Sequence, residues 1–286
     1  MKQKLLISFL AILILALTTR AQALQFEFVA AGEPSLNLPH DLVLSPDLRL
    51  LYVADNGNDR IAVLDPDSLE VLGTFGAAEL SAPHDVAFDH KGRLLVADTG
   101  NDRVVVFRLN GARGENVGVI KGSFRRPEGV AVVPGGRVYV SGAYSDNLVA
   151  IENGVEAAAI KGLSSPHDVE IDPAGHVLVV DSNNDRLLIL TPGLQTVKIL
   201  AGPPYNFNGP RYAFYDAVGR LWIADKYAHM VKVLGSDYEL LGVIGTGKAG
   251  KQPGQLDRPE GVDVRGRDVW ISDTYNNRIV RYRIAD

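Results

Sequence analysis

The sequence predicts an all-β fold, a β-propeller of six four-stranded blades, on the basis of three observations. A Pro-x-x segment that leads into short apolar strands recurs at Pro39, Pro83, Pro127, Pro166, Pro210 and Pro259. The spacings between these prolines are 44, 44, 39, 44 and 49 residues, a period typical of propeller blades. The apolar runs inside each repeat are too short to show a helical period, so we expect almost no helix.

The first predicted element is a cleavable signal peptide over residues 1–23. Lys2 and Lys4 give a positively charged start, residues 5–17 form an apolar run of 13 residues, and residues 21–23 (Ala-Gln-Ala) offer a small-x-small cleavage site. As a helix the run would rise only about 20 Å, which is short of a hydrocarbon core of roughly 30 Å. We therefore expect an exported protein, periplasmic or secreted, with no stable membrane anchor.

The rest of the chain, residues 24–286, is predicted to form one domain, the propeller. Removal of Lys2, Lys4 and Arg20 leaves 26 basic residues (29 less these three) against 34 acidic ones, a formal net charge of −8. An acidic surface argues against nucleic acid as a partner. The chain has no cysteine, so its stability must come from the core and from ring closure. A closed ring has no free end blade, and we expect a monomer.

The strands within each repeat are recognised by composition and by the turns that separate them. Residues 50–53, 93–96 and 138–140 are short runs rich in apolar, β-branched or aromatic residues, bounded by turn-forming residues. A turn of the form Asp-x-x-Asn-Asp-Arg follows the second strand, for example over residues 55–60. Asp and Asn accept backbone hydrogen bonds and tolerate turn conformations, so we expect these turns to be structural. They begin at Asp55, Asp98, Asp181 and Asp273.

The repeats resemble NHL repeats. The resemblance is carried by residues 127–132 (Pro-Glu-Gly-Val-Ala-Val), by residues 259–264 and by residues 272–279. It recurs in phase over almost the whole of the mature chain and implies a six-bladed propeller. Two blades depart from the pattern: Gly142 replaces the Asp of the turn in blade three, and residues 226–230 (Lys-Tyr-Ala-His-Met) replace Asn-Asp-Arg in blade five.

The two ends of the mature chain predict how the ring closes. The last repeat stops at residues 281–284, its third strand, whereas residues 25–29 form an orphan strand directly after the signal peptide. We expect this strand to complete blade six as its outer strand, because a closed ring leaves no open end blade.

The topology predicts where a site would lie. Strands alternate in direction within a blade, so the Pro-x-x segments and the Asp-x-x-Asn-Asp-Arg turns should lie on the same face of the disc. The first strand lines the channel, and the residue after each proline should circle the channel mouth. A ring of titratable groups at a concave mouth is a candidate functional site. Its members are His40, His84, Glu128, His167, Arg211 and Glu260.

The Pro-His pattern resembles the zinc-binding propeller of peptidyl-amidoglycolate lyase. This resemblance implies one divalent metal ion in the channel, preferably zinc, with Arg211 and Tyr212 as counterparts of the residues that serve the lyase chemistry. Ligands on alternate blades would be His84, His167 and Glu260, and His40 is a neighbouring or replacement ligand.

Two functions stay open on the sequence alone. In the first, the propeller is a binding module whose top face and channel mouth take up a peptide, a glycan, a small molecule or a protein. Glu128, Tyr144, Tyr227 and Tyr275 are the candidate binding residues, since aromatic residues are enriched at interfaces. In the second, it is a metal-dependent lyase or hydrolase in which Arg211 holds an anionic group.

Overall fold

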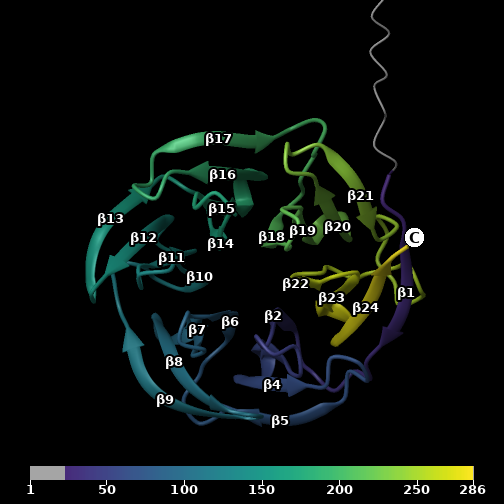
Figure 1. Cartoon of the computed structure of the whole chain (residues 1–286), viewed down its shortest axis with the longest axis horizontal. Helices are drawn as coiled ribbons and strands as arrows, with labels where there is room; N and C mark the ends of the chain where they lie inside the picture. The colour runs from purple at the N-terminus through teal and green to yellow at the C-terminus, as the bar shows by residue number, and fades with distance from the viewer. Residues whose placement is uncertain (1–22, 286) are drawn as a thin grey trace, which may run out of the picture.

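Six four-stranded antiparallel sheets form a ring around a central axis in the computed structural model, which describes residues 23–285 (Figure 1). The six-bladed β-propeller predicted from the repeats is thereby confirmed. The predicted signal peptide lies outside the described residues, apart from Ala23. Within the described part of the chain, no helix has the length and apolar character needed to cross a membrane.

Blades one to three follow one another in sequence, and each begins at the channel and ends at the rim. Blade one contains β2 (Pro39–Leu44), β3 (Leu51–Asp55), β4 (Arg60–Leu64) and β5 (Val71–Phe75). Blade two contains β6 (Pro83–Phe88), β7 (Leu94–Asp98), β8 (Arg103–Asn110) and β9 (Arg113–Ile120). Blade three contains β10 (Pro127–Val132), β11 (Val138–Gly142), β12 (Asn147–Glu152) and β13 (Val155–Lys161).

Blades four and five repeat this order, and blade six takes its outer strand from the start of the chain. Blade four contains β14 (Pro166–Ile171), β15 (Val177–Asp181), β16 (Arg186–Leu190) and β17 (Thr196–Ala201). Blade five contains β18 (Pro210–Tyr215), β19 (Leu221–Asp225), β20 (Met230–Leu234) and β21 (Leu240–Ile244). Blade six contains β22 (Val262–Arg265), β23 (Asp268–Asp273), β24 (Arg278–Ile284) and β1 (Phe26–Ala31).

The ring closes as the sequence predicts. Strand β1 pairs antiparallel with β24, with Phe26 opposite Ile284 and Phe28 opposite Tyr282. Alternate residues of β1 are partly buried, and the Phe26 ring meets the Trp222 ring of blade five edge-on at a centroid distance of 5.8 Å. The N-terminal strand therefore pairs within blade six and also packs against its neighbour.

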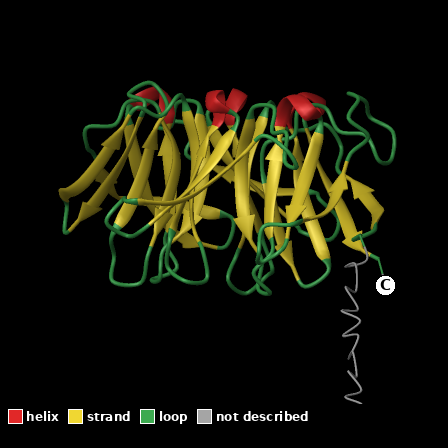
Figure 2. Ribbon diagram, turned by 90° about the horizontal axis from the view of Figure 1, so that it is seen from above, coloured by secondary structure: helices red, strands yellow, loops and turns green. Residues whose placement is uncertain are grey.

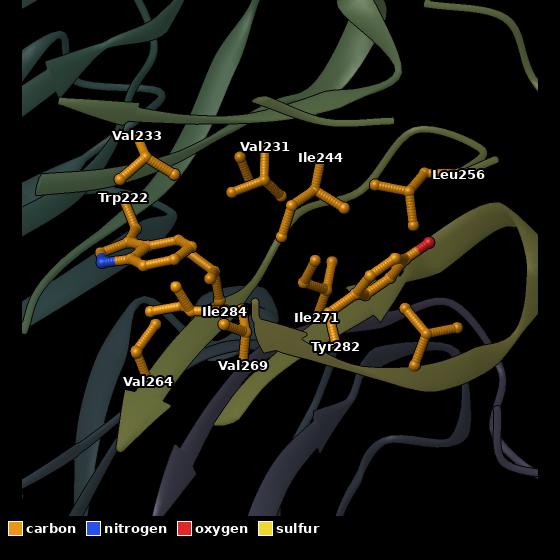
Figure 3. Close-up of a cluster of buried hydrophobic side chains, with 13 residues drawn as sticks. Trp222, Val231, Val233, Ile244, Leu256, Val264, Val269, Ile271, Tyr282 and Ile284 are labelled. Carbon is orange, nitrogen blue, oxygen red and sulfur yellow. The ribbon is translucent and has the colours of Figure 1, made fainter. Parts of the chain in front are cut away.

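Apolar side chains fill the spaces between adjacent blades. Figure 3 shows the cluster between blades five and six, in which Trp222, Val231 and Val233 face Ile271 and Tyr282. Five further clusters of this kind occupy the other interfaces of the described ring. Because both sides of a blade are covered, the second strands β3, β7, β11, β15 and β19 are buried along their whole length. This packing gives the propeller a rigid frame on which loops can carry a site.

One face of the disc carries a short 3-10 turn between the second and third strands in five blades (Figure 2). These turns are η1 (Asn56–Asn58), η2 (Thr99–Asn101), η3 (Ser182–Asn184), η4 (Lys226–Ala228) and η5 (Thr274–Asn276). Hydrogen bonds such as Gly57 N–H to Asn37 O join each turn to the segment before the proline. The turns and the Pro-x-x segments thus share one surface, as expected, and we call it the top face.

Candidate functional site

One side-chain hydrogen bond on the top face recurs in all six blades and joins each blade to the next, and we call it the staple. The turn after the second strand ends on a residue with a φ of 49° to 57°, a left-handed conformation that Asp and Asn tolerate better than most residues. Its side chain accepts a hydrogen bond of 2.6 to 3.2 Å from the backbone N–H of the residue before the next proline. The six acceptors are Asp59, Asp102, Asp146, Asp185, His229 and Asn277.

The first Asp of each turn organises its own blade. Asp55 accepts one hydrogen bond from the backbone N–H of Asn37 at 2.8 Å and another from the Nε of Arg60 at 2.7 Å. The same arrangement holds at Asp98, Asp181 and Asp273. These carboxylates are fully buried and satisfied within the protein, which agrees with the structural role expected for the turns.

The six residues that follow the prolines meet at the channel mouth and fill it. No side chain among His40, His84, Glu128, His167 and Glu260 is more than 12% exposed, and Arg211 is 7% exposed as a residue. The rings of His40 and His84 pack edge-on at a centroid distance of 4.2 Å. The predicted ring of polar residues is therefore present, but it forms a packed layer across the mouth.

The ring splits into two ionic groups, each built around one glutamate. Glu128 lies between two histidines, with 2.6 Å from its Oε2 to the Nε2 of His167 and 3.8 Å from its Oε1 to the Nε2 of His84. Glu260 lies 2.9 Å from the Nδ1 of His40 and 2.5 Å from the Nζ of Lys226. The carboxylate that joins His84 to His167 is thus Glu128, which the sequence suggested for binding, while Glu260 belongs to the other group.

The electrostatics of the ring follow from this pairing. Burial would raise the pKa of Glu260, but the neighbouring His40, Lys226 and Arg211 outweigh it and hold the pKa well below its usual range. Burial, together with the nearby His40, lowers the pKa of His84 to about 3, so this imidazole is neutral at neutral pH. The mouth therefore contains an ionised Glu260 with the cationic partner Lys226, next to an uncharged His84.

Arg211 and Tyr212 take different places in the site. Arg211 points into the ring, where its Nη1 lies 3.0 Å from the Nδ1 of His167 and its Nη2 donates to the hydroxyl of Tyr227 at 3.4 Å. Tyr212 is 1% exposed and donates its hydroxyl hydrogen to the backbone carbonyl of Glu128 at 2.9 Å. Burial, followed by nearby carboxylates, raises the pKa of Tyr212 well above its usual value. The side chain of Arg211 thus points into the channel mouth, whereas the hydroxyl of Tyr212 links blade five to blade three beneath the ring.

Blade five replaces a structural side chain with a longer, charged one. In blades one, two, four and six the first residue after the turn Asp donates a hydrogen bond of 2.5 to 3.2 Å to the carbonyl of the next proline. These donors are Asn56, Thr99, Ser182 and Thr274. Lys226 stands at this place in blade five and extends past the proline to Glu260. The junction of blades five and six therefore differs from these four junctions at the place where the ring meets the turns.

Two tyrosines and three cations gather at this junction, and we call them the cation–tyrosine cluster. Tyr227 and Tyr275 are 46% and 42% exposed, and the guanidinium of Arg258 lies 4.4 Å from the centroid of the Tyr275 ring. Lys226 lies 5.4 Å from the same ring and 5.7 Å from that of Tyr227. The cluster consists of Arg211, Lys226, Tyr227, Arg258 and Tyr275.

Tyr144 does not join this cluster. It lies in the β11–β12 turn of blade three, is 72% exposed, and has the guanidinium of Arg125 6.0 Å from its ring centroid. The structure thus brings together two of the three tyrosines that the sequence suggested.

The candidate metal ligands are close to one another but are engaged with other groups. His84 and His167 each place Nδ1 2.9 Å from a backbone carbonyl, of Ala82 and Ser165 respectively, so that Nε2 faces the mouth. The Nε2 of His167 is taken by Glu128 at 2.6 Å. Among residues 23–285, no group of three or more His, Asp or Glu side chains is arranged to hold a metal ion. As arranged, these donors do not fit a metal site.

Below the ring, the inner strands carry acidic residues that the sequence analysis did not single out. Asp85 and Asp168 each accept a hydrogen bond from a backbone N–H of the following blade, of Val130 and Ala213 respectively. Burial, followed by Asp85, raises the pKa of Glu170 to about 8. The sequence repeat did mark Glu170 as unusual. It occupies the position at which blades one, two, three and five have the apolar residues Val43, Ala87, Ala131 and Phe214.

Asp85 and Glu170, together with Asp41, line the closed end and wall of a channel cavity of about 360 Å³. It extends between the inner strands towards the face opposite the top face, where Pro46 and Arg265 lie at the ends of their strands. The cavity along the channel therefore lies beneath the ring, whereas the sequence analysis placed the concave site at the mouth.

The fold and site define a six-bladed β-propeller with a polar layer closing one end of its channel. Three segments match the family model of the NHL repeat, residues 80–107, 163–190 and 256–282, so the chain contains NHL repeats. These matches fall in blades two, four and six. No curated protein matches the chain in sequence.

Solved structures with similar folds include both enzymes and binding proteins. A streptogramin B lyase has a TM-score of 0.66 at 12% identity, covering 92% of this chain and 98% of that one. Virginiamycin B lyase from Staphylococcus aureus has a TM-score of 0.64 at 9% identity, covering 92% and 100%. An auxiliary nutrient binding protein from Bacteroides thetaiotaomicron has a TM-score of 0.70 at 13% identity, covering 92% and 77%. At these identities the likeness shows the fold alone.

Proposed function

We propose that the protein is exported and acts as a binding module, and that its cation–tyrosine cluster binds a carboxylate-bearing ligand such as an acidic peptide segment. The observation that carries the proposal is the state of Arg258. Its guanidinium lies against the Tyr275 ring and makes no hydrogen bond or ion pair with any residue from 23 to 285. A guanidinium held in this way keeps its planar fork of donors free for a carboxylate.

The surroundings of Arg258 support an anionic ligand. Lys226 and Arg211 add two positive charges, and the buried Glu260 next to them offsets only part of this charge. The carboxylate of the adjacent residue Asp257 lies 3.4 Å from the Nδ1 of His229. A cationic patch on a chain of net negative charge concentrates the local field and attracts anions. The exposed faces of Tyr227 and Tyr275 add apolar contact area at a low cost in conformational entropy.

The repeat itself supplies a matched control for the test. Arg126 stands directly before Pro127 in blade three, as Arg258 stands before Pro259 in blade six, and both donate their backbone N–H to the residue that ends the preceding turn. Arg126 has no tyrosine beneath its guanidinium in the described structure. Replacing either arginine with alanine removes a cation without removing the staple.

The binding test uses fluorescein-labelled hexaglutamate as probe, hexalysine as a charge-reversed probe, and mature protein of residues 24–286. We expect hexaglutamate to bind, and Arg258→Ala to weaken binding by about tenfold or more, since losing a charged interface anchor costs about 2 kcal/mol. Arg126→Ala should leave the affinity within about twofold of the parent. Equal losses in the two variants, or tighter binding of hexalysine, would overturn the proposal.

A metal-dependent lyase or hydrolase is the second candidate function, and one observation favours it. His84 and His167 keep Nδ1 on backbone carbonyls and present Nε2 to the mouth, the orientation that metal-bound histidines adopt through their second nitrogen. For both to serve as ligands, Glu128 must move from His167. Elemental analysis of the parent protein and of a His84→Ala, His167→Ala variant tests this candidate. Near-stoichiometric zinc or another divalent metal in the parent, lost in the variant, supports it, and equal metal content in both rejects it.

A further inference from the structure

The channel cavity beneath the ring is a second candidate site, and it opens on the other side of the protein from the cation–tyrosine cluster. All six blades contribute to its lining through their inner strands. Its volume of about 360 Å³ is in the range of small-molecule sites. The ring residues above it are not among its lining residues, so the two sites are separated by the packed layer of the mouth.

Most side chains that line the cavity are apolar, although polar and apolar groups expose nearly equal surface to it. Leu44 and Val132 line it at the level of the lower inner strands, and Phe88 and Phe214 contribute two aromatic side chains. Both phenylalanines are partly exposed, as are Val43 and Ile171 beside them. An apolar surface of this kind, left accessible inside a channel, favours a ligand with an apolar body.

The charged groups of the cavity are predominantly acidic. Asp41 and Asp85 lie at its closed end, with their carboxyl groups in hydrogen-bond contact, and Glu170 lies on the wall. The side chain of Glu170 accepts only a weak hydrogen bond of 3.3 Å, from the backbone N–H of Ile171. Two carboxyl groups in contact, without a cation between them in the described residues, form an arrangement that a positive charge would stabilise.

The one cation that lines the cavity is already paired. The Nη1 of Arg265 forms a close ion pair with Asp263, and its guanidinium lies 4.9 Å from the centroid of the Phe214 ring. Asp263 in turn accepts the backbone N–H of Leu44 at 2.8 Å. Arg265 therefore forms its ion pair with Asp263, and Asp41, Asp85 and Glu170 have no ion pair with a cation among the described residues.

We propose that this cavity binds a small organic cation with an apolar body, of the alkylammonium or arylammonium class. The ammonium group would lie among Asp41, Asp85 and Glu170, and the apolar body against the valine, leucine and phenylalanine walls. Phe88 adds an aromatic side chain to this apolar wall, whereas the Phe214 ring already carries the guanidinium of Arg265. The proposal is independent of the cation–tyrosine cluster, which has the opposite charge and lies on the other face.

Three probes with the same six-carbon chain separate charge from apolar contact: hexylammonium, hexanoate and 1-hexanol. Titration calorimetry on the mature protein measures each affinity. We expect hexylammonium to bind about tenfold or more tightly than the other two, a difference of about 1.4 kcal/mol. At pH 9, above the Glu170 pKa of about 8, Glu170→Gln should lower hexylammonium affinity by about fivefold or more, because it removes a charge and keeps the side-chain shape.

Two further variants, one that blocks the cavity and one that alters the other site, serve as controls for this test. Ala87→Phe places in blade two the residue that Phe214 provides at the same repeat position, so it fills the channel and should abolish binding of all three probes. Tyr275→Ala alters only the cation–tyrosine cluster and should leave hexylammonium binding unchanged. Equal affinity for hexylammonium and hexanol, or hexylammonium binding that survives Ala87→Phe, would overturn the proposal. Failure of hexaglutamate to bind would bear only on the top face.

Discussion

Single residues decide where this propeller departs from its own repeat. At four blade junctions a short side chain donates a hydrogen bond to the next proline carbonyl, and the junction is closed. Lys226 is too long for that bond and extends to Glu260. The neighbouring Tyr227 stays exposed on the top face. Lysine at this structural position therefore brings a charge to the channel mouth. The backbone of the turn keeps its conformation, since η4 matches the other four 3-10 turns.

Glu170 provides a prediction at the residue scale. Its pKa is raised to about 8 in the fold, primarily by burial and then by Asp85, whereas an unfolded glutamate titrates near about 4.5. Between these two pH values unfolding releases a proton, so Glu170 lowers stability as pH rises, by up to about 1.4 kcal/mol per pH unit. Above pH 8 both states are ionised and the penalty is constant.

Replacing Glu170 with Gln removes this titration. We expect Glu170→Gln and the parent to have similar free energies of unfolding near pH 4.5. The variant should then become steadily more stable than the parent up to about pH 8. Urea unfolding at several pH values measures it, and the exposed Glu115→Gln serves as control. A difference between Glu170→Gln and parent that stays flat over this range would contradict the assignment.

Blade five shows that an element of the fold can keep its structure when its sequence motif is altered. Blade five has Met230 where four other turns have arginine, yet Asp225 still accepts the backbone N–H of Asn208 at 2.7 Å. The cation comes from Lys232, two residues further along the chain, whose Nζ contacts Asp225 and donates to the carbonyls of Tyr205 and Asn206 at 2.7 and 2.9 Å. The position of the charge in space is kept although its position in the sequence has moved.

This compensation predicts a rescue between two residues of β20. Lys232→Val should lower the free energy of unfolding by about 3 kcal/mol or more, because it leaves the buried Asp225 carboxylate without its cation. Adding Met230→Arg restores the arrangement of blades one, two, four and six, in which Nε of arginine lies 2.6 to 2.8 Å from the turn Asp. We expect it to recover about half of the loss or more in chemical unfolding. Equal stability of the single and double variants would show that Lys232 acts in another way.

The whole molecule depends on the joining of its two ends. Strand β1 supplies the outer strand of blade six, and its inward residues contact two blades at once. The phenyl ring of Phe28 packs edge-on against Tyr282 at a centroid distance of 5.5 Å. Since each blade is stapled to the next on the top face, and Asn277 joins blade six to blade one, closure is secured both at the rim and near the axis.

Removal of residues 24–31 tests closure. We expect the shortened chain to lose more than about 10 °C of thermal stability, because an unpaired β24 edge and the apolar side chains of blades five and six become exposed. A variant with Glu27→Ala and Val29→Ala changes the exposed side of the same strand and should melt close to the parent. Similar melting temperatures for the shortened chain and the parent would show that the ring does not need this strand.

Most of the fold followed from the repeat. The recurring prolines predicted six blades, the orphan strand predicted the closure, and the residues after the prolines predicted which side chains reach the mouth. These predictions succeed because each blade is a local unit whose strands, turns and inward positions recur at a nearly constant spacing. The exceptions in blades three and five were also visible, although Tyr144 and Tyr227 proved to lie in different surroundings.

What the sequence by itself determined is thus the architecture and the membership of the ring. Only the tertiary structure decided that Glu128 pairs with His84 and His167, that the mouth is packed, and that the open cavity with Glu170 lies beneath it. The physical reason is that pairing across a channel depends on side-chain conformations in six blades at once. The sequence period carries the position of each residue on its strand, but not the distances between side chains of blades that are far apart in the chain.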